Sequence, residues 1–178
     1  MRKLTTAELN RPAVEQLQQL PRIPLVLLLD NIRSAFNVGS IFRTADAFRV
    51  ERVVLCGITA TPPHREVLKT ALGSTGSVPW QYEADAVGAA GRLKQQGYRM
   101  VAVEQTDKSR NLQEFLPDGR PLVLIFGNEV RGIGPVLQLA DEAVQIPQWG
   151  FKHSLNVAVA AGIVLWEICR KCGWIGEG

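Results

Sequence analysis

The apolar residues of the chain fall into short continuous runs, separated by longer segments in which they recur at helical spacing. The run 25–29 ends at Asp30 and predicts a strand that is buried on both faces. Further strands are predicted at 53–56, 100–103, 122–126 and 143–146, and helices at 40–48, 64–72, 84–96, 135–140 and 154–171. This alternation predicts an α/β fold, with a mostly parallel sheet flanked by helices.

Ser40 and Ser154 are the polar residues at which two of these helices are expected to start. Residues 1–22 are predicted to form a separate N-terminal arm and residues 23–178 a single domain. In the arm, Leu9, Val14, Leu17 and Leu20 form an amphipathic pattern that Pro12 interrupts. A helix packed on the domain or on a partner is the favoured interpretation of that pattern.

The composition limits the class of protein but does not indicate a function. A hydrophobic fraction of 46% and a charged fraction of 21% are typical of an ordinary globular protein. The net charge of +3 allows an acidic partner without requiring one. The basic residues are clustered at 33–52, at 65–69 and at 108–110.

Cysteine and histidine usage argues against a metal site. The three cysteines are an odd number and no signal peptide is recognised, which predicts reduced thiols in the cytoplasm. The only histidines are His64 and His153, whereas a zinc site needs about four ligands. The longest apolar run, 157–166, is about half the length of a membrane span. Neither a metal nor a membrane is expected as a partner.

Three segments with unusual residues follow predicted strands, at 30–43, 126–134 and 146–156. In an open parallel sheet, ligands bind beyond the carboxyl ends of the strands. We therefore expect the three segments to converge on one site.

The segment 126–134 holds three glycines, which allow a tight turn and a close approach to a ligand. It matches neither a P-loop nor the dinucleotide fingerprint, so an ordinary surface turn is an equally good interpretation. Glu129 within it is either a solvated charge or the partner of a neighbouring cation.

In the segment 30–43, Asn37 and Gly39 are expected just before a helix and Arg43 on its first turns. Arg43 could bind a phosphate in bidentate fashion. Spacing alone slightly favours the alternative, a surface arginine beside Asp46.

The segment 146–156 ends in Ser154 and Asn156, at the start of a helix that is apolar on every side. A polar pair is costly to bury there unless it binds something. The pair therefore indicates both a site and a buried interface.

Taken together, three stretches resemble the three motifs of the SpoU–TrmH family of RNA ribose 2′-O-methyltransferases, in the SPOUT class. They are NVGSIFRTADAF at 37–48, LIFGNEVRGI at 124–133 and IPQWGFKHSLNVAVA at 146–160. Their order and spacing match, and the resemblance covers roughly residues 24–170.

The resemblance implies a C-terminal deep trefoil knot that binds S-adenosylmethionine, and a homodimer in which two subunits complete the site. It implies an RNA partner, tRNA or rRNA. The catalytic residues it implies are Arg43, Asn37, Glu129, Ser154 and Asn156. The cofactor residues it implies are Phe126, Gly127, Asn128, Glu129, Ile146, Ser154 and Leu155. We assign RNA contacts to Arg33, Arg43, Arg65, Lys69, Arg131 and Lys152.

The chemistry fits these residue types. A sulfonium is a good leaving group, so methyl transfer needs an aligned nucleophile more than a Lewis acid. The family arginine is usually described as the base, but a guanidinium keeps its proton below about pH 12. We therefore treat Arg43 as the group that orients the ribose hydroxyl and binds the adjacent phosphate, with base action as the stronger hypothesis.

The chain also departs from the family pattern. Many relatives carry an extra N-terminal RNA-binding domain, so here RNA is expected to bind the dimer surface. Ala158 stands where relatives often have serine, and Trp149 either stacks on a base or covers the site. The alternatives to an active enzyme are a knotted RNA-binding protein without activity and a generic nucleotide-binding enzyme, the latter disfavoured because both phosphate fingerprints are missing.

Overall fold

A computed structural model describes residues 1–5, 8, 16 and 19–174 of the chain. The pattern that we interpret as an amphipathic arm depends on Leu9, Val14 and Leu17, which lie outside the described residues. Among those that are described, Leu20 is exposed, and its carbonyl accepts a hydrogen bond from the Arg49 guanidinium at 2.8 Å.

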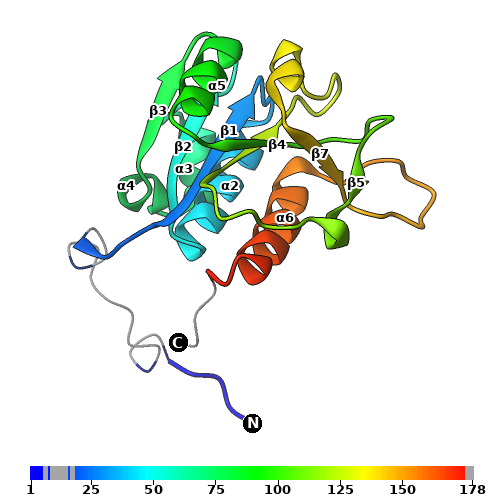
Figure 1. The fold of residues 1–178 in the computed structure, drawn as a ribbon. Helices are drawn as coiled ribbons and strands as arrows, with labels where there is room; N and C mark the ends of the chain where they lie inside the picture. The colour runs from blue at the N-terminus through cyan, green and yellow to red at the C-terminus, as the bar shows by residue number, and fades with distance from the viewer. Residues whose placement is uncertain (6–7, 9–15, 17–18, 175–178) are drawn as a thin grey trace.

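The domain is built on a seven-stranded sheet in the order β3-β2-β1-β6-β4-β7-β5, and every neighbouring pair is parallel (Figure 1). The strands are β1 (Ile23–Asp30), β2 (Val50–Cys56), β3 (Trp80–Glu83), β4 (Arg99–Val103), β5 (Arg110–Asn111), β6 (Leu122–Phe126) and β7 (Glu142–Gln145). The α/β class with a parallel sheet, predicted from the sequence, is confirmed.

Helices cover both faces of the sheet. They are α2 (Ala35–Ala47), α3 (Arg65–Ala71), α4 (Ser74–Ser77), α5 (Ala86–Gln95), α6 (Val157–Lys171) and the 3-10 helices η1 (Leu112–Glu114) and η2 (Pro135–Leu139). Residues of α2, α3 and α6 belong to the core on one face, and residues of α5 and η2 to the core on the other.

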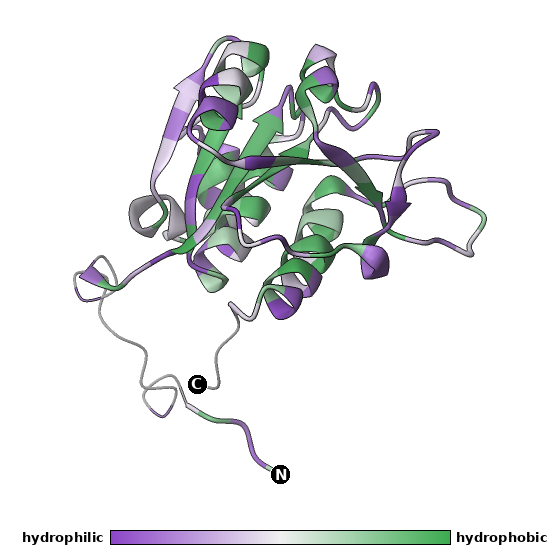
Figure 2. Cartoon of the chain, in the orientation of Figure 1, coloured by the Kyte–Doolittle hydropathy of each residue, from purple (hydrophilic) through white to green (hydrophobic). Residues whose placement is uncertain are grey.

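Strand β1 lies inside the sheet between β2 and β6, and its burial on both faces explains the unbroken apolar run in its sequence. Leu25, Leu27 and Leu29 point into the core beneath α2 and α6, while Val26 and Leu28 point into the core beneath α5. All five side chains are 0% exposed. In Figure 2 the inner strands are coloured as hydrophobic and lie between helices.

Two predicted helix starts are wrong. Helix α2 begins at Ala35, because the Ser34 hydroxyl caps it by accepting the Asn37 N–H at 3.3 Å. Ser40 lies inside the helix and donates to the Phe36 carbonyl at 2.9 Å. The buried face of α2 starts at Ala35 and Val38, upstream of the predicted cap, so Asn37 and Gly39 belong to the helix.

Helix α6 begins at Val157 rather than Ser154. The Asn156 side chain is its cap and accepts the N–H groups of Ala158 at 2.9 Å and Val159 at 3.3 Å. Asparagine is a strong cap, and here its carbonyl oxygen satisfies two of the free N–H groups of the first turn.

Strands β3 and β5 and helix α4 were not predicted. Strand β3 is an edge strand whose four residues are exposed or half-buried, and β5 has two residues. Neither β3 nor β5 contains an apolar run, which is the pattern that predicted the other strands, and α4 contains none either. No helix among the described residues is long and apolar enough to cross a membrane.

The turn from β1 into α2 is held by a buried hydroxyl. Thr59, 3% exposed, donates to the Leu29 carbonyl at 3.1 Å and accepts the Ile32 N–H at 2.9 Å. These bonds fix the path of the chain between the end of β1 and the cap of α2.

Thr59→Val should lower the free energy of unfolding by about 1–3 kcal/mol, because it leaves the buried Ile32 N–H without its acceptor. Urea denaturation measures the change. Thr61→Val is the matched control, since the Thr61 hydroxyl forms no hydrogen bond with the described residues, and its effect should stay within about 0.5 kcal/mol. Equal effects of the two variants would contradict this role of Thr59.

Candidate functional site

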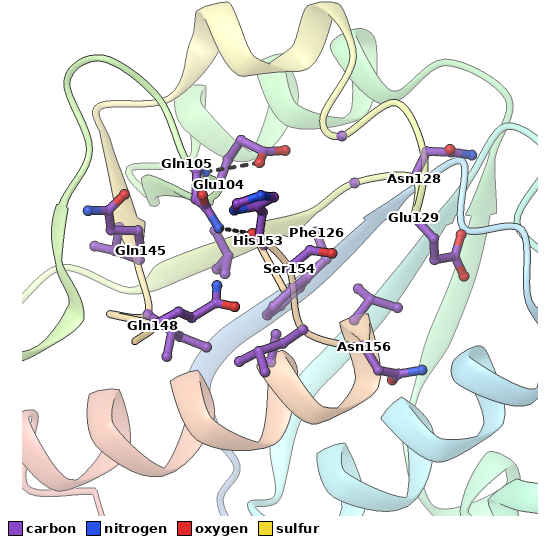
Figure 3. A pocket seen from close by; sticks show the side chains of 18 of the residues that line it. Glu104, Gln105, Phe126, Asn128, Glu129, Gln145, Gln148, His153, Ser154 and Asn156 are labelled. Atoms are coloured by element: carbon purple, nitrogen blue, oxygen red, sulfur yellow. Dashed lines mark hydrogen bonds between the residues drawn. The ribbon is translucent and has the colours of Figure 1, made fainter. Parts of the chain in front are cut away.

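A pocket of about 570 Å³ opens at the carboxyl ends of β4, β6 and β7, beside the start of α6. Figure 3 shows Glu104 and Gln105 entering it from the segment after β4, Asn128 and Glu129 from the segment after β6, and Gln145 and Gln148 from the end of β7 and the residues that follow. The pocket thus lies where ligands bind parallel sheets.

A chain of side-chain hydrogen bonds joins the three sequence motifs beside this pocket. The Asn37 amide nitrogen donates to Glu129 Oε1 at 2.9 Å. The Asn156 amide nitrogen donates in turn to Asn37 Oδ1 at 3.0 Å. The three motifs are therefore joined through one side chain each, and Asn37 is hydrogen-bonded to both Glu129 and Asn156.

Glu129 also caps the segment that leads into α2. Its two oxygens accept the backbone N–H groups of Arg33 at 2.8 Å and Ser34 at 3.1 Å. Partial burial acts to raise the pKa of this carboxyl, but the N–H groups of Arg33 and Ser34 and the Asn37 amide outweigh it and hold the pKa below its ordinary value of 4.5. Glu129 is therefore a negative charge fixed at the amino end of α2.

The segment 126–134 folds back on itself, and its glycines allow two parts of its backbone to pack closely together. The backbone groups of Asn128 and Gly132 bond to each other at 3.0 and 2.9 Å. A side-chain carbon on Gly127 would lie 2.3 Å from the carbonyl carbon of Gly132, which no backbone could accept. The segment is thus a tightly packed turn, and residues 129–131 at its tip are exposed at the surface.

Two further bonds tie this segment to β1. The Asn128 amide donates to the Asn31 carbonyl at 2.7 Å. The buried Asp30 carboxylate accepts the Gly134 N–H at 2.9 Å and the Asn31 amide at 2.7 Å. The ends of the neighbouring strands β1 and β6 are thus locked together.

All seven residues predicted to hold the cofactor line the pocket. They are Phe126, Gly127, Asn128, Glu129, Ile146, Ser154 and Leu155. Asn156 lines it as well. The structure therefore brings the second and third motifs together as expected, while the roles assigned to these residues remain predictions.

Arg43 lies elsewhere. It is exposed on α2, nearly two turns after Asn37, and does not line the pocket of its own chain. Six residues of helix place the two side chains about 120° apart around the axis, so they leave α2 in different directions. Within the described residues, Arg43 forms neither a hydrogen bond nor an ion pair.

The other basic residues assigned to RNA are all exposed, in two groups. Arg33, Arg131 and Lys152 belong to the three segments that converge at the pocket, whereas Arg65 and Lys69 lie on α3. The Lys69 ammonium sits 5.7 Å from the centre of the Phe36 ring.

Glu104 and Gln105, which follow β4, line the pocket, although they were not predicted from the sequence. The Gln105 amide donates at 2.8 Å to the carbonyl of His153, a third pocket residue that was not predicted. No motif marks Glu104 or Gln105. Their signal is the position of β4 between β6 and β7, which the order of strands along the chain does not reveal.

Fold and pocket together define an α/β protein with a ligand site at the carboxyl edge of a parallel sheet. The sequence model of the SpoU rRNA Methylase family matches residues 24–166. The chain therefore belongs to the SpoU rRNA methylase family, as its three motifs had suggested.

Individual relatives support the same family. The chain is 32% identical over 176 residues to a tRNA (guanosine(18)-2′-O)-methyltransferase of Thermus thermophilus, covering 96% of this chain and 86% of that one. It is 30% identical over 165 residues to a putative TrmH family tRNA/rRNA methyltransferase of Staphylococcus saprophyticus, covering 92% of this chain and 66% of the relative.

A solved structure gives the same picture. The AdoMet-bound rRNA methyltransferase from Sinorhizobium meliloti superposes with a TM-score of 0.78 at 30% identity, over 86% of this chain and 59% of that one. The chain thus spans about two thirds of the Staphylococcus relative and less of this structure.

The charge of Glu129 should make stability depend on pH. Because the folded pKa lies below 4.5, the stabilisation is present above that value and is lost as pH falls through the folded pKa. Wild type should therefore unfold at higher urea than Glu129→Gln at neutral pH, and the difference should shrink in acid. Asp107→Asn, whose exposed carboxylate accepts no hydrogen bond in the described chain, serves as the control. A difference that is constant with pH would contradict the assignment.

Proposed function

We propose that this protein is an S-adenosylmethionine-dependent methyltransferase that modifies the ribose 2′-hydroxyl of tRNA or rRNA. The observation that carries the proposal is the hydrogen-bonded chain from Glu129 through Asn37 to Asn156, beside a pocket lined by the second and third motifs. Relatives named for 2′-O-methylation of tRNA and of 23S rRNA support both substrate classes.

The pocket fits the proposed cofactor. Phe126, Ile146 and Leu155 offer apolar walls for an adenine ring, and the Ser154 hydroxyl and nearby amides offer hydrogen bonds for ribose and amino-acid groups. A volume of about 570 Å³ suits a ligand of this size. Among the described residues no group of His, Cys, Asp or Glu could hold a metal ion, and the reaction needs none.

S-adenosylmethionine supplies a methyl group on a positively charged sulfur, which is a good leaving group. The chain must then align a ribose hydroxyl and remove its proton. Asn37 and Asn156, fixed by their mutual bond, are placed to orient polar groups at the pocket mouth. Arg43 binds the phosphate next to the target ribose and orients the hydroxyl. Arg33, Arg131 and Lys152 provide further phosphate contacts around the pocket.

A homodimer accounts for the position of Arg43 outside the pocket of its own chain. Helix α6 exposes apolar side chains that the domain does not cover, with Val159 52%, Ile163 40% and Trp166 56% exposed. Beside them lies an apolar groove of about 630 Å³ that includes Ile146, Trp149 and Trp166. A second copy seated on this surface would bury it and complete the site.

We also propose that the C-terminal part of the chain is knotted. The segment between β4 and β6 crosses α6 in Figure 1. The Lys171 ammonium, at the end of α6, donates to the carbonyls of Gln113 at 2.5 Å and Phe115 at 3.0 Å within that segment. Helix α6 is thus held beneath a covering segment, as a threaded chain requires. The proposal includes one domain at 23–178 and a location in the cytoplasm, where its RNA substrates are found.

Arg43→Ala should lower the transfer of labelled methyl groups to bulk RNA by at least about 100-fold, with the free energy of unfolding unchanged because Arg43 is exposed and without a partner in its own described chain. Arg92→Ala, on the opposite face of the sheet, is the control and should keep full activity. Full activity of Arg43→Ala would contradict the assigned role. A wild-type protein that binds the cofactor and RNA without transferring methyl would instead indicate an inactive RNA-binding member of the family.

Trp166→Glu should convert the dimer to a monomer in sedimentation velocity, because it places a charge in an apolar interface. It should also reduce methyl transfer. Val87→Glu, an exposed position on α5, is the control and should leave the dimer intact. A wild-type protein that sediments as a monomer at high concentration would contradict the homodimer.

A further inference from the structure

Glu104 is the pocket residue whose charge the described structure does not compensate. It follows β4, which lies between β6 and β7, and it lines the pocket (Figure 3). Its carboxylate accepts two backbone N–H groups, from Gln105 at 2.9 Å and from Ile133 at 3.0 Å, one on each oxygen. These bonds fix its orientation but bring no positive charge.

The contrast with Glu129 is informative. Glu129 accepts three hydrogen bonds at the amino end of α2, where the helix dipole is positive and favours an anion. Glu104 accepts the N–H of Ile133, which precedes only the five-residue 3-10 helix η2, and it forms no ion pair in the described residues. The side chains that line the pocket include these two carboxylates and neither lysine nor arginine. The pocket is thus acidic, in a chain whose net charge is +3.

The segment 126–134 makes room for this carboxylate. Gly132 has a φ of +70°, and a side-chain carbon there would lie 2.5 Å from Glu104 Oε2. A larger residue would have to displace Glu104. The loop that carries the second motif therefore also holds Glu104 at a defined position in the pocket.

We infer that Glu104 is a specificity-determining residue that favours the positively charged cofactor over its uncharged-sulfur product. The inference rests on the proposed function. In the transfer, the bond from the methyl carbon to sulfur breaks and its electron pair stays on sulfur, while a bond to the ribose oxygen forms and the hydroxyl proton leaves. Sulfur thereby loses its positive charge, and a fixed carboxylate that attracts the cofactor attracts the product less.

Such a residue would assist turnover as well as binding. An enzyme whose pocket had the same affinity for cofactor and product would be inhibited by its own product. Because the attraction of Glu104 depends on the charge at sulfur, it weakens when the reaction is complete and favours release of S-adenosylhomocysteine.

Isothermal titration calorimetry with three ligands tests the inference. They are S-adenosylmethionine, S-adenosylhomocysteine and sinefungin, in which a carbon that bears a protonated amine replaces the sulfonium sulfur and its methyl group. Glu104→Gln should weaken binding of the two cationic ligands about tenfold and leave the affinity for S-adenosylhomocysteine nearly unchanged. Glu104→Asp keeps the charge and should keep most of the preference. Glu66→Gln, an exposed position on α3, is the control and should leave all three affinities unchanged.

The outcomes are distinguishable. If Glu104→Gln weakened all three ligands equally, Glu104 would only hold the backbone of Gln105 and Ile133, and the inference would be wrong. Unchanged affinities would also overturn it. If wild type bound none of the three ligands, the proposed function itself would fail, independently of Glu104.

Discussion

The site depends on one constraint: the carboxylate of Glu129 must satisfy the backbone at the amino end of α2 while it also holds Asn37. Glu129, in the segment after β6, accepts the N–H groups of Arg33 and Ser34, the two residues immediately before α2. Asn37 can then use its carbonyl oxygen to fix the Asn156 amide. The hydrogen bonds of Glu129 and Asn37 thereby join segments that lie about a hundred residues apart in sequence.

The order of strands determines what else the pocket contains. Strands β1 and β6 are neighbours, so the first and second motifs meet directly. Strand β4 lies between β6 and β7, so Glu104 comes between the second and third motifs, although it precedes both in the sequence. The pocket therefore combines motif residues, recognised by family resemblance, with residues that only the topology places there.

The sequence predicted the fold class and the converging segments because buried parallel strands and glycine-rich turns leave strong local patterns. Strand β6 was predicted with its observed bounds, since all five of its residues are buried. The starts of α2 and α6 were misplaced because several polar residues precede each helix, and only the geometry shows which of them accepts the first N–H groups. Exposed strand β3 carried no apolar pattern, and Glu104 carried no motif. The knot, the dimer and the roles of the site residues remain predictions, since each depends on threading, pairing or ligands rather than on local pattern.

The Ile146 side chain lines both the polar pocket and the apolar groove beside α6. If the groove is where two copies associate, a side chain shared by both spaces makes them thermodynamically linked. A cofactor in the pocket would order the Ile146 side chain, and the second copy would then lose less conformational entropy on binding in the groove. The apparent affinity for the cofactor would then rise with the concentration of the protein itself. Dilution of the protein would then lower its activity by weakening cofactor binding, although no inhibitor occupies the site.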